Sequence, residues 1–221
     1  MTFRQPDPAA VHALFAADRE FQSRIAQLWN EACAAAPAGV GCGAGCSGCC
    51  RWLFDMTLLD GWRLARALSQ LPAERQQQLA AQARPQWQAL CQALGHDPDD
   101  GLFDETCPPD AWPEMALTCA LLDDAGLCGL YAARPIVCRR HGLPLLDAAG
   151  RLDPAELCEH HRLSVAQAAA VAQRWPLAEL YRQEGALERQ ALRLLLGREL
   201  EVVTCLPAVL AGVLSFPEVN G

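Results

Sequence analysis

The sequence predicts a mainly α-helical chain with a small, irregular β-hairpin subdomain (an α+β arrangement), and we expect a single domain over residues 1–221. Two observations predict this class. Apolar residues recur at helical spacing near both ends of the chain. By contrast, residues 41–56 and 115–160 are irregular and hold eight of the twelve cysteines. With 52% apolar residues, the chain can bury a core without metal or disulfide staples.

Helices are expected on both sides of a cysteine-rich region that covers residues 41–160. The opening segment, residues 6–37, places apolar side chains on one helical face and ends at Pro37. Residues 164–197 show the same helical pattern. The apolar stripe of the first helix consists of Val11, Leu14, Phe15, Phe21, Ile25, Leu28 and Trp29.

Two further helices are predicted inside the cysteine-rich region. Thr57 and Asp60 have the spacing of a capping box with the shorter acid, which would start a helix over residues 58–71. Residues 72–95 predict another helix, in which Pro85 would cause a kink or a break.

Short β structure is expected between these helices. The alternating "RWLFDM" of residues 51–56 predicts a strand with Trp52, Phe54 and Met56 on one face. Residues 115–131 predict a hairpin that turns at residues 124–126, and residues 143–152 a smaller one. Residues 96–113 are acidic and proline-rich, which is typical of a solvated loop.

The charge pattern excludes several classes of protein. A net charge of −8 argues against a nucleic-acid partner, because a protein binds nucleic acid through a basic surface. All 18 basic residues are arginine, so no lysine forms a Schiff base or binds a phosphate in a P-loop. No signal peptide is evident, and the apolar residues 205–216 are too short to span a bilayer. We therefore expect a cytoplasmic protein with no membrane partner, whose cysteines are metal ligands or redox groups rather than disulfides.

The first cysteine group has the spacing C-x3-C-x2-C-C within one glycine-rich loop. Ligands two and three residues apart let a loop fold around a metal centre, and glycines bring backbone N–H groups near sulfur. Adjacent cysteines point in different directions from an extended backbone, which suits a bulky cluster or two neighbouring centres. The predicted metal ligands of this group are Cys42, Cys46, Cys49 and Cys50.

A second group of predicted metal ligands is more widely spaced. Its members are Cys119, Cys128, Cys138 and Cys158. The hairpin would bring Cys119 and Cys128 to the same end of the small β region. The eight thiols could serve one centre or two. Small buried hydrophobic side chains are the alternative interpretation for this second group.

The two blocks together resemble a known family. "CGAGCSGCCR" and then "CALLDDAGLCGLYAARPIVCRRHG" are similar to the bacterial cysteine-cluster (CxxCxxCC) family, described as zinc- or iron-chelating or iron–sulfur cluster-containing proteins. The resemblance covers residues 42–160, although Cys42 and Cys46 are separated by one residue more than in the family pattern. Matching residues of the second block are Tyr131, Arg134, Pro135, Cys138 and Arg139.

We expect an iron–sulfur cluster, of the [4Fe–4S] type, rather than zinc. Both accept four thiolates, but structural zinc sites favour paired C-x2-C knuckles, whereas this loop packs four cysteines into nine residues. The spacing C-x3-C-x2-C also occurs in radical S-adenosylmethionine enzymes; the adjacent Cys50 and the absence of a run of βα units oppose that interpretation. A flagellin lysine methylase carries a similar loop, so methyl transfer to a protein stays open.

The remaining candidate residues favour simpler roles. Cys33, Cys91 and Cys205 lie in apolar surroundings, and Cys107 is not expected to be a ligand. The three histidines His141, His160 and His161 are expected to be surface or supporting polar residues. Arg134 and Arg139 either offset the charge of a thiolate cluster or form ordinary ion pairs.

Three function classes follow from the sequence: a redox or electron-transfer protein, a structural zinc module that binds an unknown protein partner, and a cluster-dependent enzyme.

Overall fold

The fold is mainly helical with one very small sheet. The computed structural model describes residues 3–35, 45–113, 115, 117–141, 144, 158, 160–173 and 177–218. Two-residue strands β1 (Asp55–Met56) and β2 (Thr204–Cys205) pair antiparallel, with Asp55 opposite Cys205. This confirms the predicted fold class. The helices are α1 (Pro8–Ala35), α2 (Leu58–Ser69), α3 (Ala73–Leu94), α4 (Ile136–Arg140), α5 (Val165–Ala172), α6 (Leu177–Leu196) and α7 (Leu206–Leu210), and the 3₁₀ turns are η1 (Gly48–Arg51), η2 (Pro109–Ala111) and η3 (Tyr131–Ala133).

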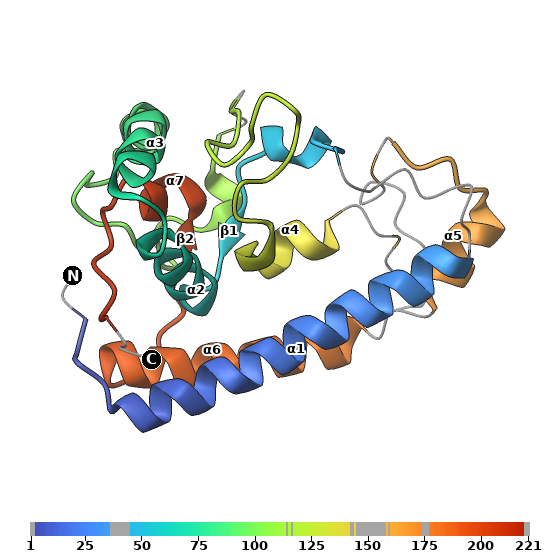
Figure 1. The fold of residues 1–221 in the computed structure, drawn as a ribbon, viewed down its shortest axis with the longest axis horizontal. Helices are drawn as coiled ribbons and strands as arrows, with labels where there is room; N and C mark the ends of the chain where they lie inside the picture. The colour runs from blue at the N-terminus through green and yellow to red at the C-terminus, as the bar shows by residue number, and fades with distance from the viewer. Residues whose placement is uncertain are drawn as a thin grey trace.

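Two long helices form the base of the molecule. Figure 1 shows α1 and α6 side by side along its length, and the two helices pack on each other. Helices α2, α3 and α7 gather over one end of this pair, and α5 packs on α1 at the other end. The short helix α4 lies between these two ends and contacts α1. The cysteine-bearing segments are therefore held in the middle of the molecule, above the base.

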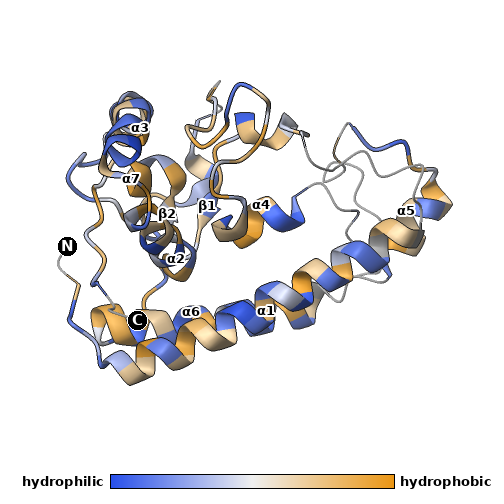
Figure 2. Cartoon of the chain, in the orientation of Figure 1, coloured by the Kyte–Doolittle hydropathy of each residue, from blue (hydrophilic) through white to orange (hydrophobic). Residues whose placement is uncertain are grey.

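Two hydrophobic clusters hold these layers together. The larger one joins the first half of α1 to α2, α3, α7 and the end of α6, and contains the fully buried Trp62 and Phe103. The smaller one consists of Phe21, Ile25, Ile136, Val171 and Leu180. Figure 2 shows the corresponding hydrophobic stripes along α1 and α6. Because Ile136 belongs to the smaller cluster, apolar burial fixes α4 on α1.

The long helices agree with the sequence pattern. Residues 6–37 contain α1, and Thr57 caps α2 by accepting a hydrogen bond from the backbone N of Asp60 at 3.1 Å. Of the kink or break predicted at Pro85, the break does not occur, because α3 continues through this residue. Ala83, Trp87 and Leu90 are buried on either side of this proline, so packing outweighs the lost backbone hydrogen bond. The predicted helical run 164–197 contains two separate helices, α5 and α6.

The predicted β segments are much shorter than expected. Of residues 51–56, only Asp55 and Met56 form a strand, and their partner is β2 rather than a neighbouring segment. Trp52 ends η1 and is 66% exposed, whereas Met56 is buried, so the two do not share a face. The predicted hairpin is reduced to one bridge, between Leu122 and Cys128. The smaller hairpin, residues 143–152, lies outside the described residues except for Pro144.

A buried ion network replaces the predicted capping box. Asp60 does not return a bond to the Thr57 backbone; its carboxylate contacts Arg63 and accepts a hydrogen bond from the backbone N of Ile136 at 3.0 Å. The guanidinium of Arg63 also donates to both carboxylate oxygens of Asp18, at 2.8 and 2.9 Å. Asp18 and Asp60 are almost fully buried and Arg63 is 8% exposed. The network therefore ties α1, α2 and the start of α4 together through charge-assisted bonds.

Helix α6 also packs on α2 and holds its first turn. Glu188 accepts hydrogen bonds from the first two backbone N–H groups of α2, those of Leu58 and Leu59, each at 2.9 Å. These N–H groups have no partner inside the helix, so a carboxylate there acts as a cap. Burial raises the pKa of Glu188 to about 7, and burial likewise raises the pKa of Glu184 to about 7.

No helix within the described residues is long and apolar enough to cross a membrane.

Replacing the central arginine should destabilise the fold strongly. Arg63→Met leaves Asp18 and Asp60 buried without their cation, and we expect the free energy of unfolding to fall by about 3–5 kcal/mol. Arg193→Met is the matched control, because it removes an exposed pair with Glu199 and should cost less than about 1 kcal/mol. Urea unfolding of both variants measures the difference. Equal losses would mean that the buried network does not stabilise the fold.

The two raised carboxyl pKa values predict a pH dependence of stability. Between the ordinary pKa of glutamate and about 7, the folded protein binds more protons than the unfolded chain, so stability falls as pH rises through this window. Glu184→Gln should reduce that fall between pH 5 and pH 8 by about 1–2 kcal/mol. Glu179→Gln on the same helix is the control, because bonds from Arg182 and Gln183 lower the pKa of Glu179 and move its titration below this range. Urea unfolding across pH tests this, and an unchanged slope in Glu184→Gln would contradict it.

Candidate metal centre

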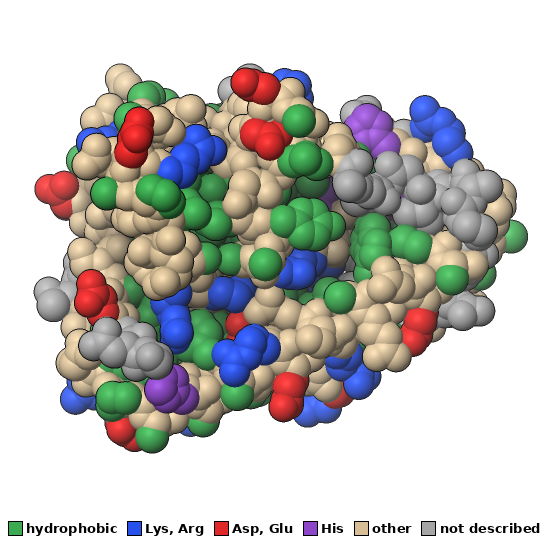
Figure 3. Space-filling model, in the orientation of Figure 1, with side chains coloured by type: hydrophobic (Ala, Val, Ile, Leu, Met, Phe, Trp, Pro, Cys, Tyr) green, Lys and Arg blue, Asp and Glu red, His purple; other side chains and the backbone are tan. Residues whose placement is uncertain are grey.

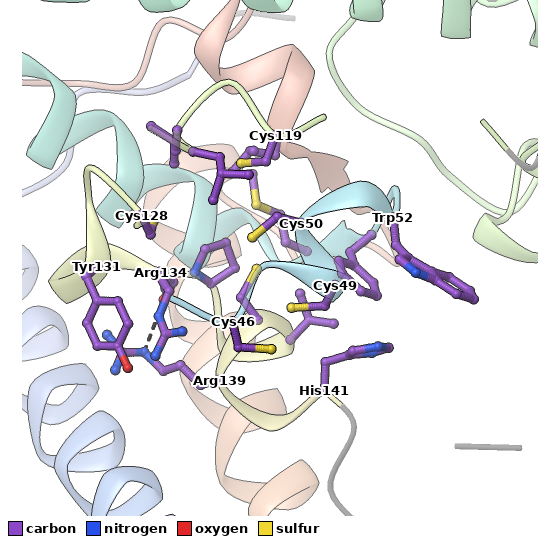
Figure 4. A pocket seen from close by; sticks show the side chains of 18 of the residues that line it. Cys46, Cys49, Cys50, Trp52, Cys119, Cys128, Tyr131, Arg134, Arg139 and His141 are labelled. Carbon is purple, nitrogen blue, oxygen red and sulfur yellow. Dashed lines mark hydrogen bonds between the residues drawn. The ribbon is translucent and has the colours of Figure 1, made fainter. Parts of the chain in front are cut away.

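Six of the eight predicted ligands line one cavity of about 610 Å³. They come from three separate segments of the chain: the loop that contains η1, the turn around residue 123, and α4. Figure 4 shows Cys46, Cys49 and Cys50 at the centre of the site, with Cys119 and Cys128 beside them. Folding therefore gathers thiols that are far apart in the sequence. The six residues are Cys46, Cys49, Cys50, Cys119, Cys128 and Cys138.

Backbone hydrogen bonds shape the first loop. The N–H of Cys50 donates to the carbonyl of Ser47 at 3.1 Å, which closes the turn of η1. The N–H of Cys119 donates to the carbonyl of Cys50 at 2.8 Å and so joins the first segment to the second. Gly48 lies close to His160, because a Cβ on Gly48 would be 2.7 Å from Nε2 of that imidazole, so a larger residue would have to displace it. This contact brings the segment after Cys158 against η1.

A tight turn places the second pair of cysteines. The carboxylate of Asp123 accepts hydrogen bonds from the backbone N of Ala125 at 3.0 Å and of Leu127 at 2.8 Å. Gly126 within this turn has a φ of 77°, a conformation that favours glycine. The turn therefore reverses the chain between Cys119 and Cys128, as expected from the sequence, although without two regular strands.

The buried ion network positions the third segment. Arg63 donates to the carbonyl of Arg134 at 3.2 Å, and Asp60 accepts from the backbone N of Ile136 at 3.0 Å. Cys138 follows two residues later on α4. The position of this thiol thus depends on charges that lie beneath the site rather than in it.

The thiols that line the cavity differ in their pKa values and therefore in their protonation. A hydrogen bond between the side chains of Cys49 and Cys50 lowers the pKa of Cys49 to about 6, and the positive charge of Arg134 acts in the same direction. The same bond, together with burial, raises the pKa of Cys50. Burial raises the pKa of Cys119 to about 11 and also raises that of Cys138. One thiolate among several protonated thiols is therefore expected in the metal-free site.

The other predicted ligands are placed differently. Cys42 lies outside the described residues. Cys158 is half-buried and is not among the residues that line the cavity. In the part of the chain that the structure describes, no three Cys, His, Asp or Glu side chains are arranged to hold a metal ion, and all eleven cysteines there are free thiols. Cys91 and Cys205 are buried in the larger core, as the sequence predicts.

Aromatic and basic residues complete the wall of the cavity. The guanidinium of Arg134 lies over the ring of Tyr131, 3.6 Å from its centroid. His141 lies beside Phe54 and Trp52, with ring centroids 4.7 and 6.1 Å away. Figure 4 shows Tyr131, Arg134 and Arg139 on one side of the cysteines and Trp52 and His141 on the other. Phe54, like Trp52 and His141, lines the cavity.

Sequence reasoning did not identify the part of the wall that α1 contributes. Ile25 and Trp29 of α1 line the cavity, although the sequence pattern assigned both to an ordinary core stripe. A possible signal lies in Asn30, a polar residue directly after Trp29 that also lines the cavity. Arg63 was missed as well, although a charged residue in the middle of the apolar "LLDGWRLA" is itself unusual.

No protein-family model, functionally curated protein or solved structure matches this chain.

The thiols of the metal-free protein should differ in reactivity. The lowered pKa of Cys49 makes it largely a thiolate at pH 7, whereas burial keeps Cys119 protonated. We expect iodoacetamide to alkylate Cys49 first, with a rate that rises through a midpoint near pH 6. Peptide mass spectrometry of samples quenched over time measures each site. If Cys119 reacts as fast as Cys49, the assignment of the thiolate is wrong.

Proposed function

We propose that this chain is a metal-binding protein whose clustered thiolates hold an iron–sulfur cluster, with a role in redox chemistry or electron transfer. One observation carries the proposal: six cysteines from three separate segments line one cavity. Structural cysteines are expected to pack as small apolar side chains inside a core, as Cys91 and Cys205 do, rather than to line a cavity. The resemblance of both sequence blocks to cysteine-cluster proteins adds to this proposal.

The donor set suits soft metals. Thiolates favour zinc and iron–sulfur clusters, and no carboxylate is among the described residues that line the cavity. Cys49 and Cys50 are adjacent, and adjacent cysteines point in different directions, which suits a bulky cluster better than a single ion. This favours a cluster over zinc. A bound iron–sulfur cluster would supply reversible one-electron chemistry.

The chain's own residues would hold, orient and partly shield such a group. The six cysteines that line the cavity are the proposed ligands. Trp52 is 66% and Tyr131 55% exposed at its rim, so the site is open to solvent at the edge and a redox partner could approach it. A structural zinc module and a cluster-dependent methyl-transfer enzyme are the alternatives.

Metal analysis of protein purified without oxygen tests the proposal. We expect iron and acid-labile sulfide in equal amounts, near four of each per chain, together with broad visible absorption. Cys46→Ser and Cys138→Ser should each lose most of the iron and the colour. Cys107→Ser is the matched control, because Cys107 is half-buried but does not line the cavity, and it should retain both.

The alternatives give different results in the same samples. Zinc without sulfide or colour would make the site a structural module that unfolds locally with a chelator. Iron with saturable S-adenosylmethionine binding would support the enzyme instead of an electron carrier. No metal after anaerobic purification, or equal metal in Cys46→Ser and Cys107→Ser, would contradict the ligand assignment.

A further inference from the structure

The cavity beside the cysteines has a positive lining in an acidic protein. The whole chain carries a net charge of −8, yet no Asp or Glu is among the described residues that line the cavity, while Arg134 and Arg139 are. Figure 3 shows basic side chains near the hollowed, apolar centre of this face and acidic side chains mostly toward its edges. A local excess of positive charge on such a chain favours an anionic ligand.

The two arginines are oriented, and neither forms a direct ion pair with a carboxylate among the described residues. Arg139 donates to the backbone carbonyls of Arg134 at 3.2 Å and Ala132 at 2.6 Å, which fixes the direction of its guanidinium. The guanidinium of Arg134 is held against the ring of Tyr131, and its Nε is buried without a hydrogen-bond partner among the described residues. Guanidinium groups held in this way suit planar anions such as carboxylates.

The rest of the cavity is apolar and aromatic. Its volume of about 610 Å³ falls within the range of about 300–1,000 Å³ that is typical of small-molecule sites. It extends from the cysteines to Trp29 on α1 and to Leu206 and Pro207 at the start of α7, which leaves room beside a thiolate-bound metal. Trp52 and Phe54 provide flat surfaces on which a ring can stack.

We propose that this cavity is a binding site for a small organic anion with an aromatic body, whose anionic group contacts Arg134 and Arg139 and whose ring lies against the aromatic wall. This proposal goes beyond the metal site and does not depend on which metal the cysteines hold. The competing explanation is that the two arginines only neutralise thiolates. The two explanations differ in what the arginines affect: ligand binding in the first case, metal content in the second.

Two fluorescent probes that differ only in charge test the site on the full-length protein. The first, 8-anilinonaphthalene-1-sulfonate, has an aromatic body and an anionic group; the second, N-phenyl-1-naphthylamine, has the same rings without the sulfonate. We expect the anionic probe to bind one site at least tenfold more tightly than the neutral probe, because only the former engages the guanidinium groups. Benzoate should displace the anionic probe, and benzyl alcohol at the same concentration should not.

Single substitutions separate charge from packing. Arg134→Gln and Arg139→Gln should each weaken the anionic probe about tenfold and leave the neutral probe unchanged, with metal content retained. Trp29→Ala should weaken both probes. Arg140→Gln is the matched control, because Arg140 lies over Tyr181, 4.4 Å from its ring centroid, and does not line the cavity.

The outcomes that overturn the proposal are distinct from a failure of the proposed metal site. Equal binding of the two probes, or an anionic probe that binds as well to Arg134→Gln and Arg139→Gln as to the wild type, would mean that no anion site exists. Loss of metal in these variants with unchanged probe binding would assign the arginines to the thiolates. Near-ultraviolet circular dichroism and the neutral probe report whether each variant keeps its fold. If Arg134→Gln does not fold, the binding of the anionic probe to Arg139→Gln decides the test alone.

Discussion

The contact of Arg63 with Asp18 and Asp60 is the interaction on which the rest of the structure depends. It joins α1 to α2, and through Asp60 and Arg63 it reaches the backbone of Ile136 and Arg134. Burying three charges is costly, and hydrophobic side chains of similar volume often stabilise a core equally well. The network supplies what apolar packing does not: directional bonds that fix where α4 begins. The site residues on α4, Cys138 and Arg139 among them, take their place from that fixed point.

The same network explains why the site lies in the middle of the molecule. Helix α4 has only five residues, too few to be stable on its own. Ile136 anchors it in the smaller hydrophobic cluster, and Asp60 satisfies its first free N–H group. The turn around Asp123 and the loop at η1 are likewise held by backbone bonds rather than by a sheet. Loops fixed on a helical base allow thiols from three segments to share one cavity.

The sequence predicted the features that arise from interactions between residues close together in the chain. Helical spacing identified α1, and the Thr57 side chain was correctly expected to start α2. Longer-range choices were not predictable from pattern alone. Asp60 had two competing uses, a local cap or a buried ion pair, and only tertiary packing decides between them. For the same reason Pro85 does not break α3, because the cost of one missing hydrogen bond is smaller than the burial gained around it.

In the candidate site, too, the sequence predicted local features but not those that depend on tertiary packing. Six of the predicted cysteines meet because the chain reverses at Asp123 and because α4 is anchored, whereas spacing alone could not separate them from Cys158, which does not line the cavity. Spacing also gave no information on the contribution of α1, whose Trp29 lines the same cavity. The charge balance of the cavity is likewise a tertiary property. The charge of Arg134 favours the thiolate form of Cys49 and Cys138, and that of Arg139 favours the thiolate form of Cys128, while both side chains also line the cavity. A metal that deprotonates the thiols would add negative charge there. Whether the two guanidinium groups serve the thiolates or an outside anion is therefore decided by which property, metal content or anion binding, changes when these arginines are replaced.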